Sequence, residues 1–178
     1  MTEFQRVLPS TREILRWAES KAIDAGQSHI DTPHLLHACL QDQDIRDWLR
    51  KVPVSVESAY LLTTLELPQT IALEEEDFDT KLAEFLNYLE SGEGQYKGVE
   101  GLTERAKKSI LFGGAEMAKL GNYYFHPIHL FAGIVQADVD LAERVLVREE
   151  LPRQKLLEEI EVEVQRVRLS ETFTRLKN

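Results

Sequence analysis

The feature that most constrains this fold is a segment that occurs twice. The stretch GNYYFHPIHLFAGIVQ (121–136) echoes GQSHIDTPHLLHACLQ (26–41), and equivalent positions lie 95 residues apart from the first glycine to the last glutamine. Few side chains are identical, but size is kept where identity is lost, since Leu36 matches Phe131 and Leu40 matches Val135. An internal repeat of this kind indicates a fold built from one structural unit used twice.

Each copy predicts four helices. A glycine ends the first helix, and a capping residue with proline opens the second, where a missing N–H costs nothing. We expect Ser10 or Thr11 to cap the first helix of repeat one and Thr32 to cap the second, with Pro33 at its first position. The expected helices span about 10–25, 32–41, 44–51 and 54–65 in the first repeat, and 103–120, 127–136, 139–147 and 152–168 in the second.

The segment between the repeats is long for a connection in a compact domain. It carries an acidic run and an apolar stripe that predicts an additional linker helix over about 79–90, followed by a glycine-rich tether. The chain is therefore divided into repeat one (about 8–67), linker (68–101), repeat two (about 102–169) and a tail (170–178) that either frays or begins a further element. The predicted fold is all-α: an eight-helix, pseudo-twofold bundle of two four-helix repeats plus the linker helix.

Charge and composition exclude several classes of protein. The chain has 178 residues, of which 43% are hydrophobic, so it can fill a core. Its net charge of −10 repels phosphate backbones and anionic lipid surfaces, so neither nucleic acid nor membrane is an expected partner. There is no long apolar run, signal peptide or transit pattern, which predicts a cytoplasmic location. The one cysteine, Cys39, is expected to be a buried, inert thiol.

Motifs for catalysis or cofactor binding are missing. P-loop, HExxH, CxxC and calcium-loop patterns do not occur, so we expect no enzymatic activity and no cofactor. His34 with His37 and His126 with His129 have a spacing compatible with metal ligands, which leaves a small metal-dependent enzyme as an alternative. The 95-residue offset, however, pairs only His34 with His129. The favoured interpretation is that these two rings tie the preceding loop to the helix start and bind no metal.

Two further features concern packing and surface. The pair Gly113 and Gly114, inside a predicted helix, indicates either close helix contact or a kink. Tyr123, Tyr124 and Phe125 are consecutive in a loop and cannot all point inward, so at least one is expected to be exposed or half exposed. They either pack against the neighbouring repeat or form an aromatic ledge that binds a peptide.

With these patterns in place, LTERAKKSILFGGAEMAKLGNYYFHPIHLFAGIV (102–135) resembles the N-terminal domain of the Clp ATPases, the double Clp-N or Clp R repeat. The likeness covers nearly the whole chain except the linker. The matching residues are Thr103, Glu104, Arg105, Ala106, Leu120, Gly121, His129 and Leu130, and, in the first copy, Gly26, His34, Leu35 and Leu36.

The resemblance implies a non-enzymatic α domain that recruits substrates or adaptor proteins to a hexameric unfoldase. The candidate partner- or peptide-binding residues are Thr103 and Glu104, which match the family motif, together with the aromatic residues Tyr123, Tyr124 and Phe125. The structural motif comprises Gly26, His34, Gly121 and His129.

The sequence also departs from the family pattern. Pro33 and Ile128 stand where the phosphoarginine-binding branch has an acidic residue, so that activity is not expected. The run from Pro127 to Leu130 looks closer to the disaggregase branch, whose domain offers an apolar groove to unfolded segments. The first repeat has Leu-Pro-Ser-Thr, starting at Leu8, in place of Thr-Glu-Arg-Ala.

No ATPase module accompanies the repeats in this sequence. The expected function is therefore that of a stand-alone accessory or adaptor protein of a Clp chaperone-protease, taking part in proteolysis. The alternative is the recruiting N-terminal domain of a full-length Clp AAA+ unfoldase. Expected partners are Clp ATPase or Clp protease subunits, or unfolded polypeptide segments.

Overall fold

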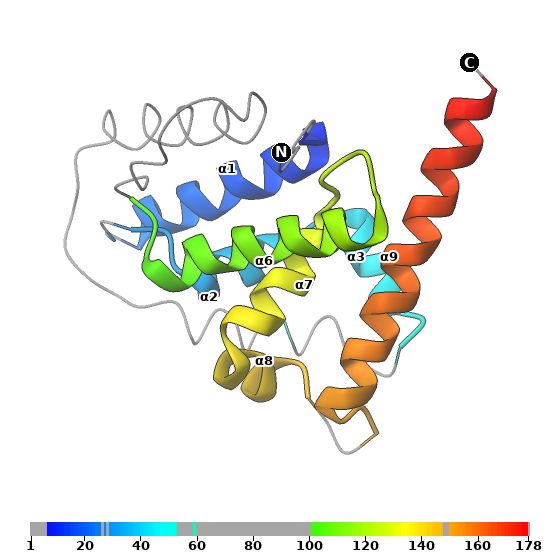
Figure 1. Ribbon diagram of the computed structural model, residues 1–178. Coiled ribbons are helices and arrows are strands. Elements are labelled where there is room, and N and C mark those ends of the chain that lie inside the picture. Colours follow the sequence, from blue (N-terminus) through cyan, green and yellow to red (C-terminus); the bar gives the residue numbers. More distant parts are fainter. Residues whose placement is uncertain are drawn as a thin grey trace.

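The computed structural model describes residues 7–25, 27, 29–52, 59, 101–147 and 150–177, and within them the chain is all-helical, as predicted. Gly26, the linker up to residue 100 and, apart from Ala59, the predicted helix 54–65 lie outside the described residues. The helices are α1 (Pro9–Asp24), α2 (Thr32–Cys39), α3 (Gln43–Leu49), α6 (Glu104–Leu120), α7 (Pro127–Ala137), α8 (Val139–Val145) and α9 (Arg153–Leu176) (Figure 1).

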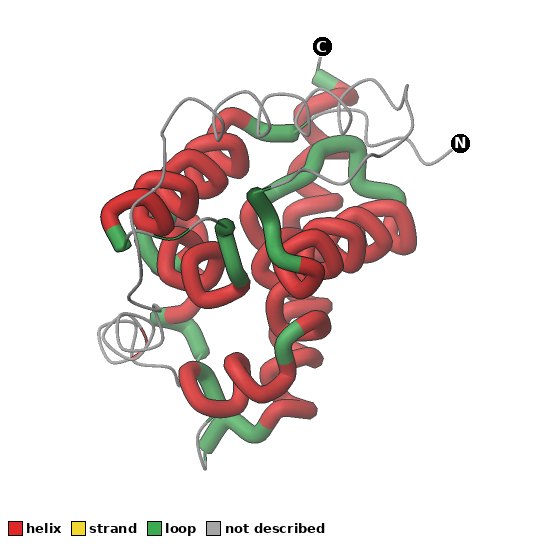
Figure 2. Tube along the Cα trace, turned by 90° about the vertical axis from the view of Figure 1, so that its left-hand side faces the viewer, coloured by secondary structure: helices red, strands yellow, loops and turns green. Residues whose placement is uncertain are grey.

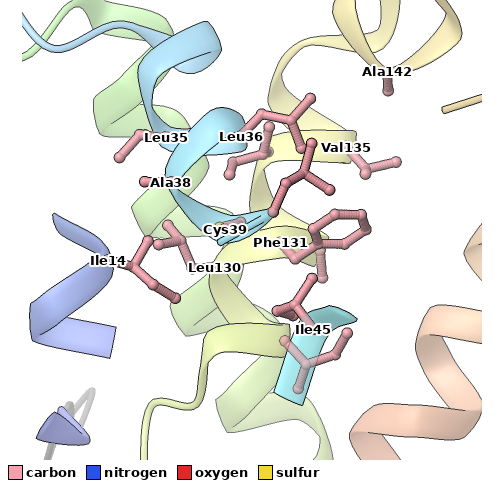
Figure 3. Packing of buried hydrophobic residues seen from close by; sticks show 14 of the residues in the cluster. Ile14, Leu35, Leu36, Ala38, Cys39, Ile45, Leu130, Phe131, Val135 and Ala142 are labelled. Atoms are coloured by element: carbon pink, nitrogen blue, oxygen red, sulfur yellow. The ribbon is translucent and has the colours of Figure 1, made fainter. Parts of the chain in front are cut away.

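Helix α7 lies at the centre of the molecule. It packs against each of the other six described helices. Figure 1 shows α7 in the middle of the molecule, and Figure 2 shows the same helices turned by 90°. A helix surrounded in this way must be apolar on all sides, and residues 127–135 of α7 are all buried. Leu130 and Phe131 meet Leu35 and Leu36 of α2 in the core that the two predicted repeats share (Figure 3). Cys39 is buried there as expected, and burial raises the pKa of its thiol.

Main-chain contact between α6 and α7 explains Gly113 on one helix and Gly133 on the other. A Cβ atom on Gly113 would lie 2.5 Å from the carbonyl oxygen of His129, and one on Gly133 would lie 1.8 Å from that of Ser109. Both distances are well below normal van der Waals contact. Close helix contact, one of the two predicted explanations for the pair, is therefore correct for Gly113, and Gly133 is the matching glycine on α7.

Two predicted helix caps are wrong. Leu8 is the N-cap residue of α1, while the hydroxyl of Thr11 donates to the carbonyl oxygen of Phe125 in the loop before α7 (2.8 Å). At α2 the cap is Asp31, whose carboxylate accepts from the N–H of Thr32 (2.8 Å). A carboxylate outcompetes a hydroxyl at a helix N-terminus because it also interacts with the helix dipole. Thr103 caps α6 as predicted, accepting from Ala106 N–H (3.2 Å).

Helix α9 is longer than predicted. It continues past Arg168 to Leu176, so the predicted end is wrong and the segment 170–176 does not fray. Contacts from Glu171 and Arg175 to the loop before α7 hold these last turns. Within the described residues, no helix is both long and apolar enough to cross a membrane.

The two predicted repeats contact each other reciprocally. Val7 forms an isolated parallel bridge with Phe125, and Ile30 forms one with Leu102. In the first bridge the N–H of Leu8 donates to the carbonyl oxygen of Phe125 (3.2 Å), and in the second the N–H of Thr103 donates to that of Ile30 (3.0 Å). Adding the 95-residue offset to Val7 and Ile30 gives Leu102 and Phe125, so each bridge is the other with the repeats exchanged.

Candidate partner-binding groove

A surface groove of about 400 Å³ lies between α9 and the loop before α7. Leu8, Tyr124 and His126 line one side, and six residues of α9 between Arg166 and Arg175 line the other. A smaller cavity of about 40 Å³ adjoins it, shares His126 and Arg166, and adds apolar side chains of α3 and α7, namely Ile45, Trp48, Pro127 and Ile128. The groove thus combines an aromatic ring, aliphatic carbon and side chains of both charges.

The aromatic loop (residues 121–126) presents two of its three predicted ledge residues. Gly121 ends α6 in the left-handed conformation (φ 70°), as its position predicts. Tyr123 and Tyr124 are half-buried, with their rings edge to face at 4.8 Å. Phe125 is only 1% exposed and its ring packs in the core, so of the three candidate ledge residues it is not available to a partner at the surface. The expectation that at least one of the three rings is exposed or half exposed is correct.

Glu171 of α9 fixes the conformation of this loop. Its carboxylate accepts from the backbone N–H groups of Tyr123 (2.8 Å) and Tyr124 (3.1 Å) and hydrogen-bonds Nε2 of His126 (2.5 Å). The guanidinium of Arg175 lies over the Tyr123 ring, 4.6 Å from its centroid. Burial lowers the pKa of His126 despite the neighbouring carboxylate, so the ring is neutral near pH 7 and, protonated at Nε2, donates to Glu171.

Sequence reasoning missed Glu171 because it placed this residue in the tail. The signal was present: no glycine or proline interrupts the chain between Arg153 and Leu176, so nothing stops the helix at residue 168. Two main-chain hydrogen bonds to one carboxylate are among the stronger hydrogen bonds in proteins and constrain the backbone of the loop. Tyr124 is therefore presented to the groove by a rigid support.

His34 and His129 make the predicted contact with the preceding loop. Their Nδ1 atoms accept from the backbone N–H groups of Asp31 and His126, each at 2.9 Å. Burial lowers the pKa of both rings, that of His129 to about 3, so each is a neutral acceptor. In the part of the chain that the structure describes, no group of three or more His, Cys, Asp or Glu side chains is placed to hold a metal ion.

Thr103 and Glu104 lie away from the groove. They stand at the start of α6, whereas the aromatic loop follows its end, about 25 Å away at 1.5 Å per helical residue. The hydroxyl of Thr103 donates to Asp31 (2.6 Å), and Glu104 pairs with Lys107 (2.9 Å) on the surface. The structure therefore does not bring the five predicted binding residues into one site.

Arg105 completes a polar cluster at this other end. It bridges Asp31 (2.7 Å) and Asp138 (3.2 Å), the caps of α2 and α8. Burial favours a raised pKa for Asp31, but hydrogen bonds from Thr103 and the Thr32 N–H, together with Arg105, lower it overall. Both aspartates are structural, and the cluster links the two predicted repeats.

Comparisons with known proteins add an independent finding. The family model of the Clp repeat (R) N-terminal domain matches residues 8–148. A structure from "Preliminary structural investigations of a malarial protein secretion system" superposes with a TM-score of 0.63 at 15% identity, covering 90% of this chain and 93% of the other. The N-terminal domain of the caseinolytic protease associated chaperone ClpD from Arabidopsis thaliana gives 0.58 at 15% identity, covering 97% and 96%. At this identity the structural matches show the fold alone. No curated protein matches the chain by sequence.

Proposed function

The chain belongs to the Clp repeat (R) N-terminal domain family, and we propose that it is a non-enzymatic protein-binding module that uses the groove beside α9. The observation that carries this proposal is the support of Tyr124 by Glu171 at the edge of the groove. A half-buried aromatic ring on a rigid loop is the type of residue that contributes most to protein interfaces, because it buries a large area with little loss of conformational entropy.

The chemistry of the groove suits a peptide segment. Tyr124, Leu8 and Val167 offer apolar contact, while Asp44, in its wall, can meet main-chain or side-chain donors. The family match ends at residue 148, so the α9 wall of the groove lies outside the matched region. We infer that this wall distinguishes the partners of this chain from those of its relatives.

The first form of the proposal is a stand-alone accessory or adaptor protein of a Clp chaperone-protease in the cytoplasm, binding Clp ATPase or protease subunits. The second is a substrate- or adaptor-recruiting N-terminal domain of a full-length Clp unfoldase, binding unfolded segments. The family match, to a domain described as the N-terminal repeat domain of Clp proteins, is compatible with both forms. Both forms use the same groove and differ in its occupant.

The proposal includes the predicted architecture of two four-helix repeats related by a pseudo-twofold axis. It is supported by the reciprocal bridges of Val7 with Phe125 and of Ile30 with Leu102. The matching ring contacts of His34 and His129 at the start of α2 and α7 support it further.

Binding measurements with purified proteins test the proposal. The 178-residue chain is titrated with the Clp ATPase and the Clp protease core of its own organism and, separately, with carboxymethylated α-lactalbumin, a permanently unfolded polypeptide. We expect binding to one of these, and we expect Tyr124→Ala to weaken it about tenfold, the loss of roughly 1.4 kcal/mol.

The matched control is Phe112→Ala, which removes an aromatic ring that is 40% exposed on α6, outside the groove. It should leave the affinity unchanged. Absence of binding at micromolar concentration would refute the proposal, and so would equal weakening by Phe112→Ala. Preference for Clp subunits supports the adaptor form, and preference for the unfolded polypeptide supports the receptor form.

A further inference from the structure

Helix α9 has two apolar faces, and only one of them packs against the rest of the chain. The buried face includes Leu156, Ile160, Val164 and Val167. A second set of apolar side chains is strongly exposed: Val162 (63%), Leu169 (60%), Phe173 (64%) and Leu176 (79%). At about 100° per residue, this second set falls on the side of the helix opposite the buried face. We call these four residues the outer stripe.

The outer stripe has the spacing of a helix-pairing seam. Its members follow one another at steps of seven, four and three residues, which keeps them on one line along the helix. Figure 1 shows α9 at one side of the molecule, with its last turns reaching the C-terminus away from the other helices. Four large apolar side chains exposed in a row on one face are uncommon on a monomer and mark an interaction surface.

The charges beside the outer stripe are separated along the helix. Close to the stripe, the first half of the helix carries Glu158 and Glu159, preceded by Lys155, and its second half carries Arg166 and Lys177. Arg175 lies on the groove side, over the Tyr123 ring. A parallel partner helix of the same sequence would place acid against acid and base against base. An antiparallel one would place each half against its opposite, so the surface is complementary to itself in one direction only.

We propose that two copies of this chain associate through their α9 helices, antiparallel, about a twofold axis at Leu169. In this register Leu169 faces its own copy, and Val162 faces Leu176 of the second molecule, because both pairs are centred on residue 169. Glu159 then lies close to Lys177 of the second molecule on the same flank of the seam. The partner that fits the surface is thus a second copy of the chain.

The proposal is independent of the function assigned to the groove. Val167 and Glu171 line the groove from the buried side of α9, while the outer stripe faces away. Pairing through the stripe therefore leaves Tyr124 accessible in both copies. A failure of self-association would not affect partner binding, and a failure of partner binding would not affect self-association.

The first test is the molar mass in solution. Light scattering or sedimentation equilibrium of the 178-residue chain over about a hundredfold range of concentration should show a rise toward twice the 20.5 kDa chain mass. Leu169→Glu places two carboxylates face to face on the axis and should weaken association at least tenfold. Leu111→Glu, the same change at a 43% exposed position on α6, should leave it unchanged. A monomer at every concentration, or equal disruption by Leu111→Glu, would overturn the proposal.

The second test fixes the direction of pairing. Leu169→Cys should form a disulfide-linked dimer on mild oxidation, whereas Cys39 is fully buried and should not react. Val162→Cys should not cross-link alone but should do so when mixed with Leu176→Cys. Glu159→Lys should weaken association and Lys177→Glu, added to it, should restore it. Efficient cross-linking of Val162→Cys to itself would indicate parallel pairing and overturn the antiparallel arrangement.

Discussion

The carbonyl oxygen of Ser109 on α6 lies 1.8 Å from the point that a Cβ atom on Gly133 of α7 would occupy. The two helices therefore touch through their main chains at this position. A methyl group there would overlap a backbone atom, and backbone atoms cannot rotate away as the end of a flexible side chain can. The contact joins the central helix to α6, so a change at Gly133 acts on the core of the whole fold.

We predict that Gly133→Ala destabilises the protein by about 3 kcal/mol or more, because α6 and α7 must separate and lose packing along the core. Urea unfolding followed by circular dichroism measures the change. Gly121→Ala is the comparison: Gly121 has a φ of 70° but its nearest neighbours are 3.9 Å away, so only backbone strain of about 1 kcal/mol is expected. Similar costs for the two variants would contradict the clash argument.

A second prediction concerns Glu171, which holds the aromatic loop. Glu171→Ala leaves two main-chain donors and His126 without their acceptor, so we expect a loss of about 2 kcal/mol and faster hydrogen exchange at the amides of Tyr123 and Tyr124. The control is Glu161→Ala, the same substitution at an exposed site of α9, so any effect of helix propensity is the same in both variants. It should alter stability by less than about 0.5 kcal/mol. Unchanged exchange at both tyrosine amides would show that Glu171 does not order the loop.

The helices were predictable because their signals are local. Apolar periodicity, the glycine at 121 and the prolines near helix starts located all seven described helices, with errors confined to their ends. The 95-residue repeat also indicated that His34 and His129 have the same role, because equivalent positions in two copies meet equivalent neighbours.

The parts of the site that could not be predicted depend on contacts between residues that are distant in sequence. Glu171 meets Tyr123 across 48 residues. The helical period places residue 171 on the same face as Val164 and Val167 once the helix is extended, but it does not indicate which loop the carboxylate contacts. The run of three aromatics did not indicate which ring packs inward; in the structure Phe125, which forms the bridge to Val7, is the buried one. Thr103 and Glu104 match the family motif because they form the start of a helix. The structure places them at the opposite end of α6 from the groove.

A third prediction compares a helix-capping aspartate, Asp138, with the ion-pairing Arg105 in the polar cluster at the start of α6. Asp138 is 6% exposed; it caps α8 through Leu141 N–H (3.1 Å) and accepts from the hydroxyl of Thr32 (2.5 Å). Asp138→Ala should therefore cost about 2 kcal/mol, the sum of a lost cap and an unpaired buried hydroxyl.

Arg105→Ala should cost less than about 1 kcal/mol, because the arginine side chain is 55% exposed and solvent screens its pairs. Its effect should also shrink in high salt, whereas that of Asp138→Ala should persist. Urea unfolding at low and high salt measures both. If Arg105→Ala proved as costly as Asp138→Ala, the ion pairs rather than the helix caps would be the main link between the repeats.

The last prediction follows from the buried histidines. Burial lowers the pKa of His129 to about 3 and that of His37 to about 4, against an ordinary value of 6.5. The unfolded chain therefore binds protons at a higher pH than the folded one, so stability is fully present above pH 6.5 and falls as the pH is lowered through that value. The loss continues until the folded-state pKa values are reached. Between about pH 6 and 4, the free energy of unfolding should fall by roughly 1.4 kcal/mol per pH unit for each of these two histidines.

His129→Asn tests this assignment. The asparagine Oδ1 can replace Nδ1 as the acceptor for the His126 N–H, but the side chain does not titrate, and the ring that packs 5.9 Å from that of Phe125 is lost. Stability at pH 7 should therefore drop by about 2 kcal/mol, while the pH dependence between 6 and 4 becomes shallower by about one proton. Urea unfolding at a series of pH values gives both quantities. An unchanged slope would mean that His129 takes up no proton on unfolding, and that its buried, neutral state is not the source of the acid sensitivity.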